Sequence, residues 1–131
     1  MTQSLTFEYN RLYSPSAPHV EVAIDGYDER YQPVALFAFV DSGADGTMLP
    51  IDILKSVGAE YADTVIMRGV AGGVQRLDRY TIRLRIGNQT VHSIEAVALD
   101  RGSEPILGRD VLNTLSLLLN GPANVTELLF D

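Results

Sequence analysis

The chain is organised around residues 34–47, an apolar run that ends abruptly at a carboxylate. The run Val34-Ala-Leu-Phe-Ala-Phe-Val40 is followed at once by Asp41-Ser42-Gly43-Ala44-Asp45-Gly46-Thr47. Apolar segments of this length and composition are typical of strands that are buried on both faces. An Asp at the point where such a strand leaves the core is expensive to desolvate unless it is hydrogen-bonded or shares its charge. Asp41 is therefore a candidate for acid–base chemistry, although Asp-Ser-Gly is also ordinary turn composition.

Length and charge limit what the chain can be. Its 131 residues predict one domain spanning positions 1–131. Seventeen acidic and ten basic residues give a net charge of −7, which disfavours nucleic acid and anionic membranes as partners. The absence of cysteine excludes disulfides, thiolate nucleophiles and Cys-ligated metals. The first residues lack the basic and apolar regions of a signal peptide, so a soluble cytoplasmic domain is expected.

Hydrophobic periodicity predicts a mostly β chain. About eight strands are expected, with turn signals at the spacing of a sandwich or barrel. One clear helix is predicted over residues 50–57, with Pro50 at its start and Gly58 just past its end. A second short helix is expected over residues 109–115. The expected strands cover residues 5–9 (weakly), 19–25, 34–40, 64–67, 77–86, 90–99, 117–119 and 125–130.

Several kinds of chemistry are absent from the sequence. The only two histidines are far apart, and no Gly-x-Ser-x-Gly elbow or phosphate-binding P-loop occurs. Asp41, Asp45 and Gly46 fit positions of a calcium-binding EF-hand loop. However, Gly43 replaces a ligand, and an Asp stands where the bidentate Glu is needed. No metal and no cofactor are therefore expected.

Carboxylate chemistry remains. Hydrolysis of an amide by carboxylates alone needs two of them close together, one ionised to draw a proton from water and one protonated to polarise the carbonyl. Two carboxyl groups about 3 Å apart share one proton because they cannot both ionise.

Three motifs resemble those of the retropepsins, the retroviral-type aspartic proteases. Val40-Asp-Ser-Gly-Ala-Asp-Gly-Thr47 looks like the catalytic motif, and Gly69-Val-Ala-Gly-Gly73 is similar to the glycine-rich tip of the flap. Ile106-Leu-Gly-Arg-Asp110 resembles the third motif. The three occur in the family's order, and the similarity spans roughly residues 20–118. The long C-terminal segment places the chain closer to the cellular and bacterial single-domain members than to the viral enzymes.

The resemblance implies a fold and a set of residue roles. The fold would be a single-lobe, closed, β-barrel-like acid-protease fold with one or two short helices. Asp41 would be the catalytic carboxylate, and Ser42 and Gly43 would support the catalytic pair. Asp45 would also form an ion pair with the planar guanidinium of Arg109. The residues expected to bind the substrate are Ala44, Asp45, Val70, Ala71, Gly72 and Gly73.

Only one Asp-Ser/Thr-Gly occurs in the chain, so the second carboxylate must come from another subunit. The sequence thus predicts an obligate homodimer with Asp41 of each copy facing the twofold axis, acting on a peptide or protein substrate. Gly46 and Asp110 depart from the commoner retroviral residues. One alternative is a catalytically silent, dimeric peptide-binding module on the same fold. Another is a small β-barrel that binds an apolar ligand.

Overall fold

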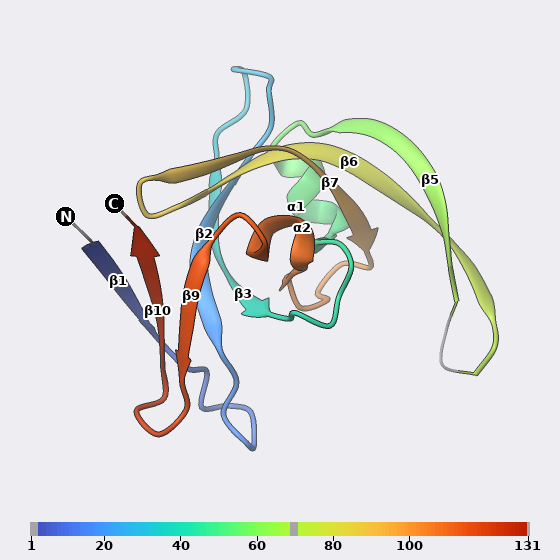
Figure 1. Cartoon of the computed structure of the whole chain (residues 1–131). Helices are drawn as coiled ribbons and strands as arrows, with labels where there is room; N and C mark the ends of the chain where they lie inside the picture. The colour runs from blue at the N-terminus through green and yellow to red at the C-terminus, as the bar shows by residue number, and fades with distance from the viewer. Residues whose placement is uncertain (1–2, 69–70, 131) are drawn as a thin grey trace.

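Six strands close into a ring in the computed structural model, which describes residues 3–68 and 71–130. The long strand β6 pairs with β5 (Glu60–Arg68) along its first half and with β2 near its end, and this second pairing closes the ring. The closure confirms the barrel-like fold expected from the sequence (Figure 1). The ring runs in the order β2 (His19–Asp25), β3 (Val34–Val40), β8 (Ile106–Leu107), β4 (Met48–Pro50), β7 (Gln89–Leu99) and β6 (Val74–Ile86).

Alternating side chains fill the interior of the ring. On β2, Val20, Val22 and Ile24 are buried, as the alternation in the sequence predicts. Burying each such side chain contributes roughly 1.5–3 kcal/mol. These three residues pack in one continuous core with inward-facing residues of the other strands and of both helices: Ala38, Val40, Leu49, Leu54, Ile82, Leu84, Ile86, Ile94, Ala96, Leu107 and Val111.

Strand β3 corrects one expectation. Its bounds are those predicted, but its outer face is only partly covered. Ala38 and Val40 point into the core, whereas Phe37, on the opposite face, is 60% exposed. The apolar composition predicts burial on both sides, yet the described residues of one copy leave the outer face of the strand open at Phe37.

The first helix, α1 (Ile51–Ser56), forms where predicted. Pro50 precedes it with φ −58°, and Leu54 buries its side chain in the core. Gly58 ends the helix with φ +65°, and a Cβ there would lie 2.4 Å from the ring of Tyr31. Both the left-handed backbone and the close ring require glycine at this position.

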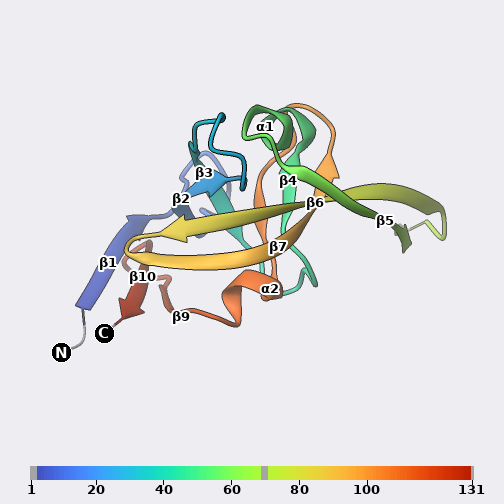
Figure 2. The ribbon, with the colours of Figure 1, turned by 90° about the horizontal axis from the view of Figure 1, so that it is seen from above.

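Strands β5 and β6 form a long hairpin that projects from the body of the molecule (Figure 2). Of the predicted flap tip, Ala71, Gly72 and Gly73 are described, and Gly72 has φ +80°. Val70, expected to bind substrate, lies outside the described residues. The strands are longer than the predicted ranges because polar residues that continue the ladder did not show the apolar alternation.

A smaller sheet of three strands packs beside the ring (Figure 1). It runs in the order β1 (Gln3–Glu8), β10 (Val125–Phe130) and β9 (Ser116–Asn120), all antiparallel. The second helix, α2 (Arg109–Leu112), is shorter than predicted, since residues 113–115 continue only as a turn. Within the described part of the chain, no helix is long and apolar enough to cross a membrane.

Candidate active site

Asp41 lies at the end of β3, on the exposed face of that strand. Because Ala38 and Val40 point inward, alternation places Phe37, Phe39 and Asp41 together on the other face. The Asp41 amide donates to the Leu107 carbonyl at 3.1 Å, so β8 fixes where β3 ends. The carboxylate is thereby delivered, half-buried, to the surface at the start of a tight loop.

The loop after Asp41 folds back onto the carboxylate. Gly43 N donates to Asp41 Oδ1 at 2.9 Å, and Ala44 N donates to the Asp41 carbonyl at 3.2 Å. A Cβ on Gly43 would lie 3.1 Å from Asp41 Oδ1, which is tighter than nine in ten such contacts. Ser42 is exposed beside the carboxylate. The sequence-predicted residues 41–45 therefore form one loop around a single aspartate.

Arg109 holds this loop by three contacts. Its backbone N–H donates to the Ala44 carbonyl at 2.9 Å, and its Nη1 donates to the Ser42 carbonyl at 2.8 Å. Its Nη2 contacts one carboxylate oxygen of Asp45, whose side chain is 95% exposed. The expected ion pair is present, but the guanidinium spans a carbonyl and a carboxylate instead of gripping both oxygens of Asp45. An ion pair this exposed contributes little stability, so the bond to Ser42 is the stronger restraint.

We expect Arg109→Lys to weaken the loop although the charge is kept. A lysine ammonium cannot contact the Ser42 carbonyl and the Asp45 carboxylate as a planar fork does. The free energy of unfolding should fall by about 1 kcal/mol. Urea unfolding of both proteins measures this effect. An unchanged free energy of unfolding would contradict this role.

A buried network that the sequence did not reveal supports the other end of the loop. Thr47 is fully buried; its N donates to Asp110 Oδ2 at 3.1 Å and its Oγ1 donates to Asp110 Oδ1 at 2.8 Å. Gly108 N donates to Thr47 Oγ1 at 3.2 Å, and Val111 N donates to Asp110 Oδ1 at 2.9 Å. Asp110 thus accepts three hydrogen bonds. Thr47 and Asp110 are 63 positions apart, so no local pattern could signal their contact.

Asp110→Asn should destabilise the protein by about 1–3 kcal/mol. Both carboxylate oxygens of Asp110 face donors, so the amide NH2 of Asn must meet at least one of the N–H groups of Thr47 and Val111 in either orientation. Urea unfolding of this variant and of Asp100→Asn, a change at an exposed site, measures the difference. Equal stability of the two variants would show that Asp110 is not needed as an acceptor.

The first and third motifs touch backbone to backbone. A Cβ on Gly108 would lie 2.4 Å from the Gly46 carbonyl carbon and 2.5 Å from its oxygen. No side chain fits between them, so the glycine in the third motif is required by packing. The loop at residues 41–47 and α2 consequently form one rigid unit.

A cleft of about 600 Å³ opens beside the loop. It runs from Gly43–Gly46 to the underside of the β5–β6 hairpin, and Asp41 lies two residues beyond its edge. A cleft of this volume is large enough for a peptide side chain or a drug-sized molecule. The apolar side chains that line it are Met48, Val65, Met67, Ile94 and Val97.

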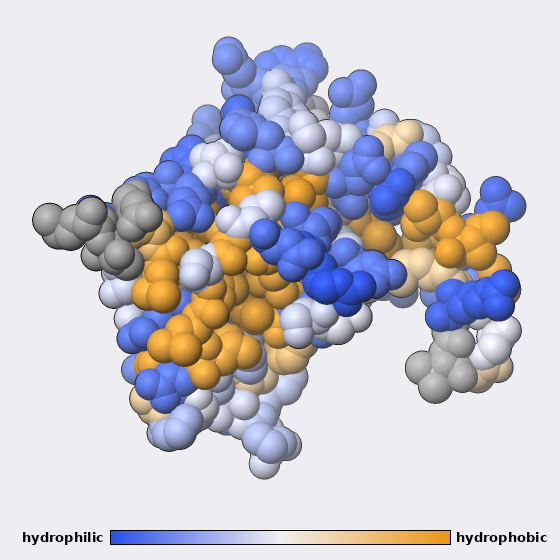
Figure 3. Space-filling model, in the orientation of Figure 1, coloured by the Kyte–Doolittle hydropathy of each residue, from blue (hydrophilic) through white to orange (hydrophobic). Residues whose placement is uncertain are grey.

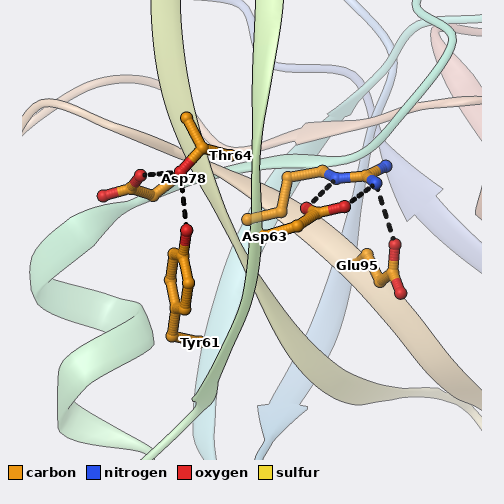
Figure 4. Close-up of polar contacts among 6 residues, drawn as sticks. Tyr61, Asp63, Thr64, Asp78 and Glu95 are labelled. Atoms are coloured by element: carbon orange, nitrogen blue, oxygen red, sulfur yellow. Dashed lines mark hydrogen bonds and ion pairs between the residues drawn. The ribbon is translucent and has the colours of Figure 1, made fainter.

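Arg79 lines the cleft, and the two carboxylates that it contacts, Asp63 and Glu95, are shown in Figure 4. Its Nε and Nη2 donate to the two carboxylate oxygens of Asp63 at 2.8 and 2.6 Å, and Nη2 also lies 3.1 Å from Glu95 Oε2. The three residues belong to β6, β5 and β7, so this cluster ties the hairpin to the barrel. Beside it, a chain of hydrogen bonds joins Tyr61, Thr64 and Asp78.

The pKa of Asp63 is lowered, chiefly by its hydrogen bonds to Arg79. A depressed pKa means that this contact stabilises the fold above the unfolded-state pKa of Asp and is lost as the pH falls through the folded-state value. We expect Arg79→Gln to raise the pKa of Asp63 towards its usual value. Carboxyl-carbon NMR titration of both proteins measures it. The same low pKa in the variant would exclude Arg79 as the cause.

A buried histidine flanks β3 and contacts a half-buried glutamate. His19 is 4% exposed; its Nε2 lies 2.7 Å from Glu104 Oε1 and its Nδ1 lies 3.1 Å from the Ala17 carbonyl. Its ring also packs edge-on against Phe39 at 5.5 Å. Its partner lies 85 positions away, beyond any local signal.

Comparison with known proteins identifies the family. A sequence model described as aspartyl protease matches residues 20–111, which include the loop around Asp41 and the third motif. The chain belongs to the aspartyl protease family. Its fold is that of a retropepsin-like aspartic protease, as the sequence predicted. No curated protein sequence matches this retropepsin-like chain.

Solved structures support the same fold. A retropepsin-like aspartic protease from Rickettsia conorii superposes with a TM-score of 0.69 at 15% identity, covering 99% of this chain and 92% of that one. EIAV protease in complex with the inhibitor HBY-793 gives a TM-score of 0.58 at 19% identity, covering 75% and 86%. At these identities the likeness concerns the fold, while the roles of individual residues rest on the geometry described above.

Proposed function

We propose that this retropepsin-like protein is an aspartic endopeptidase whose active site is completed by a second copy of the chain. The observation that carries the proposal is the single carboxylate of Asp41. It sits at the end of a core strand in a loop fixed by Arg109 and by Thr47. Such a rigid frame suits preorganised acid–base catalysis, but one carboxylate cannot be acid and base at once.

In the proposed dimer, Asp41 of each copy faces the other across a twofold axis. One carboxylate takes a proton from water while the other donates a hydrogen bond to the carbonyl of the scissile peptide. Ser42, exposed beside Asp41, would hold the two Asp41 carboxylates in place by hydrogen bonding across to the other copy. Ala44, Asp45 and the hairpin tip at residues 70–73 would hold the peptide backbone over it.

Exposed leucines support association. A broad apolar surface lies over the region of β9 and β10 (Figure 3). Leu118 and Leu119 of the edge strand β9 are 48% and 51% exposed. An unpaired, apolar edge strand invites pairing with another chain. We propose that a second copy covers this surface.

Digestion of an unbiased peptide library across pH 3–8 tests the proposal. Cleavage should follow a bell-shaped pH profile, because the shared proton is lost at high pH and a second one is gained at low pH. A rate that does not fall at both low and high pH would contradict a carboxylate pair. Binding of peptides without any cleavage would instead favour the catalytically silent module.

A further inference from the structure

A second hollow, of about 240 Å³, lies where β2, β6 and β7 pair. In the ladder Arg83 stands opposite Asp25, and Arg85 stands between Ala23 and Thr90. Because the intervening Leu84 is buried in the core, alternation turns both arginines to the outside of the barrel. The hollow shares no lining residue with the cleft beside Asp41. Its lining consists of Ala23, Asp25, Pro33, Arg83, Arg85, Thr90 and His92.

Arg83 is held in place at the wall of this hollow. Its Nε and Nη2 lie 2.9 and 2.8 Å from Asp25 Oδ2, and its guanidinium lies 5.1 Å from the centroid of the Tyr27 ring. Asp25 offsets the charge of Arg83, but it contacts only the Nε and Nη2 groups of the guanidinium. The remaining N–H groups of Arg83 are available in a fixed orientation.

The same tyrosine sets the hydrogen-bonding state of His92. Ser93 N donates to the Tyr27 hydroxyl at 2.9 Å, an arrangement that the left-handed Ser93 (φ 57°) allows. The hydroxyl lies 3.4 Å from His92 Nδ1 and has its own proton left to donate there. When the hydroxyl donates to Nδ1, the other ring nitrogen, Nε2, is the one that can donate to a ligand.

Arg85 supplies a charge that nothing balances. It is exposed, and within residues 3–68 and 71–130 it forms no ion pair. The hollow therefore presents hydrogen-bond donors from Arg83, Arg85, His92 and Thr90 against the single, already paired carboxylate of Asp25. This excess of donors occurs in a chain whose net charge is −7.

We propose that this hollow binds a small oxyanion of the phosphate class. Planar guanidinium groups match phosphate oxygens in pairs, and the His92 ring and the Thr90 hydroxyl add single donors. A volume of 240 Å³ is below the roughly 300–1,000 Å³ of sites for drug-sized ligands, which limits the occupant to a small anion. The site is independent of the proposed protease activity.

Titration of the full chain with inorganic phosphate, at constant ionic strength and pH 7, tests the proposal. Amide NMR signals of Arg85, Thr90 and His92 should shift together and saturate with a Kd of about 1–10 mM. Arg85→Gln should weaken binding about tenfold. Arg76→Gln removes the same charge from the same strand outside the hollow and should bind as the wild type does.

Three outcomes would overturn the proposal. The first is the absence of saturation up to about 50 mM phosphate. The second is equal weakening by Arg85→Gln and Arg76→Gln, which would reduce the effect to overall charge. The third is acetate binding as tightly as phosphate, which would exclude the phosphate class. The melting temperature of each variant, measured in chloride, shows that a lost response does not come from unfolding.

Discussion

Replacing Asp41 with Asn is expected to abolish peptide cleavage while leaving the fold intact. The substitution removes the carboxyl group of residue 41, and with it both the base and the shared proton of the proposed pair. Loss of general acid–base catalysis lowers rates by about 10²–10⁴-fold, and loss of both roles together places this variant at or beyond the upper end. The amide oxygen of Asn can still accept from Gly43 N, so the loop should keep its shape.

Initial rates on the best library peptide, with unfolding curves for both proteins, measure this result. Asp100→Asn is the matched control, since it makes the same chemical change at an exposed position. Equal turnover by wild type and Asp41→Asn would remove Asp41 from the mechanism. A cleaved peptide with an unstable variant would show that Asp41 acts on the fold alone.

Mixing the two proteins should give a second large effect. If two copies of Asp41 form one site, a heterodimer of wild type with Asp41→Asn carries a single carboxylate and should be inactive. With free exchange, the active fraction is the square of the wild-type fraction. Adding an equal amount of mutant to a constant amount of wild type doubles the number of dimers, of which about one quarter are active. The total activity should therefore fall to about one half of its starting value.

Slow exchange would hide this loss, so the proteins should be refolded together before assay. Mixing with Asp100→Asn in place of Asp41→Asn is the control and should not lower the activity of the wild type. Activity that stays at its starting value after joint refolding would show that each chain holds a complete site. The second acid would then have to be sought within the same chain.

Elements with a strong local signal were predicted well. The alternation of Val20, Val22 and Ile24 gave β2 its bounds and its buried face, and Pro50 and Gly58 bracketed α1. The closed ring itself could be anticipated only from the resemblance, because it depends on β6 returning to β2 across nearly 60 positions of sequence. Strand β4 was missed since its three residues are too few to show a period.

Contacts between distant residues account for the rest. Asp110 was noted only as a departure from the family pattern, whereas it accepts three hydrogen bonds that anchor Thr47 and α2. The Asp45–Arg109 ion pair was expected, but the hydrogen bond from Arg109 to the Ser42 carbonyl was not. Every residue has a backbone carbonyl, so the sequence does not indicate which one accepts a side-chain hydrogen bond. Phe37 was misplaced for the opposite reason. Its apolar character was visible, but the absence of anything covering it within one copy was not.

The backbone contact between Gly46 and Gly108 also divides the protein into regions that should open separately. Amides on both sides of that contact, such as those of Thr47 and Arg109, donate hydrogen bonds across it and should exchange with deuterium only in the largest opening events. At the hairpin tip a Cβ on Gly72 or Gly73 would meet nothing within 4 Å, so amides there should exchange early. A ligand that draws the hairpin down would then slow exchange at the tip alone. Hydrogen exchange would thus detect closure over the cleft without any measurement of cleavage.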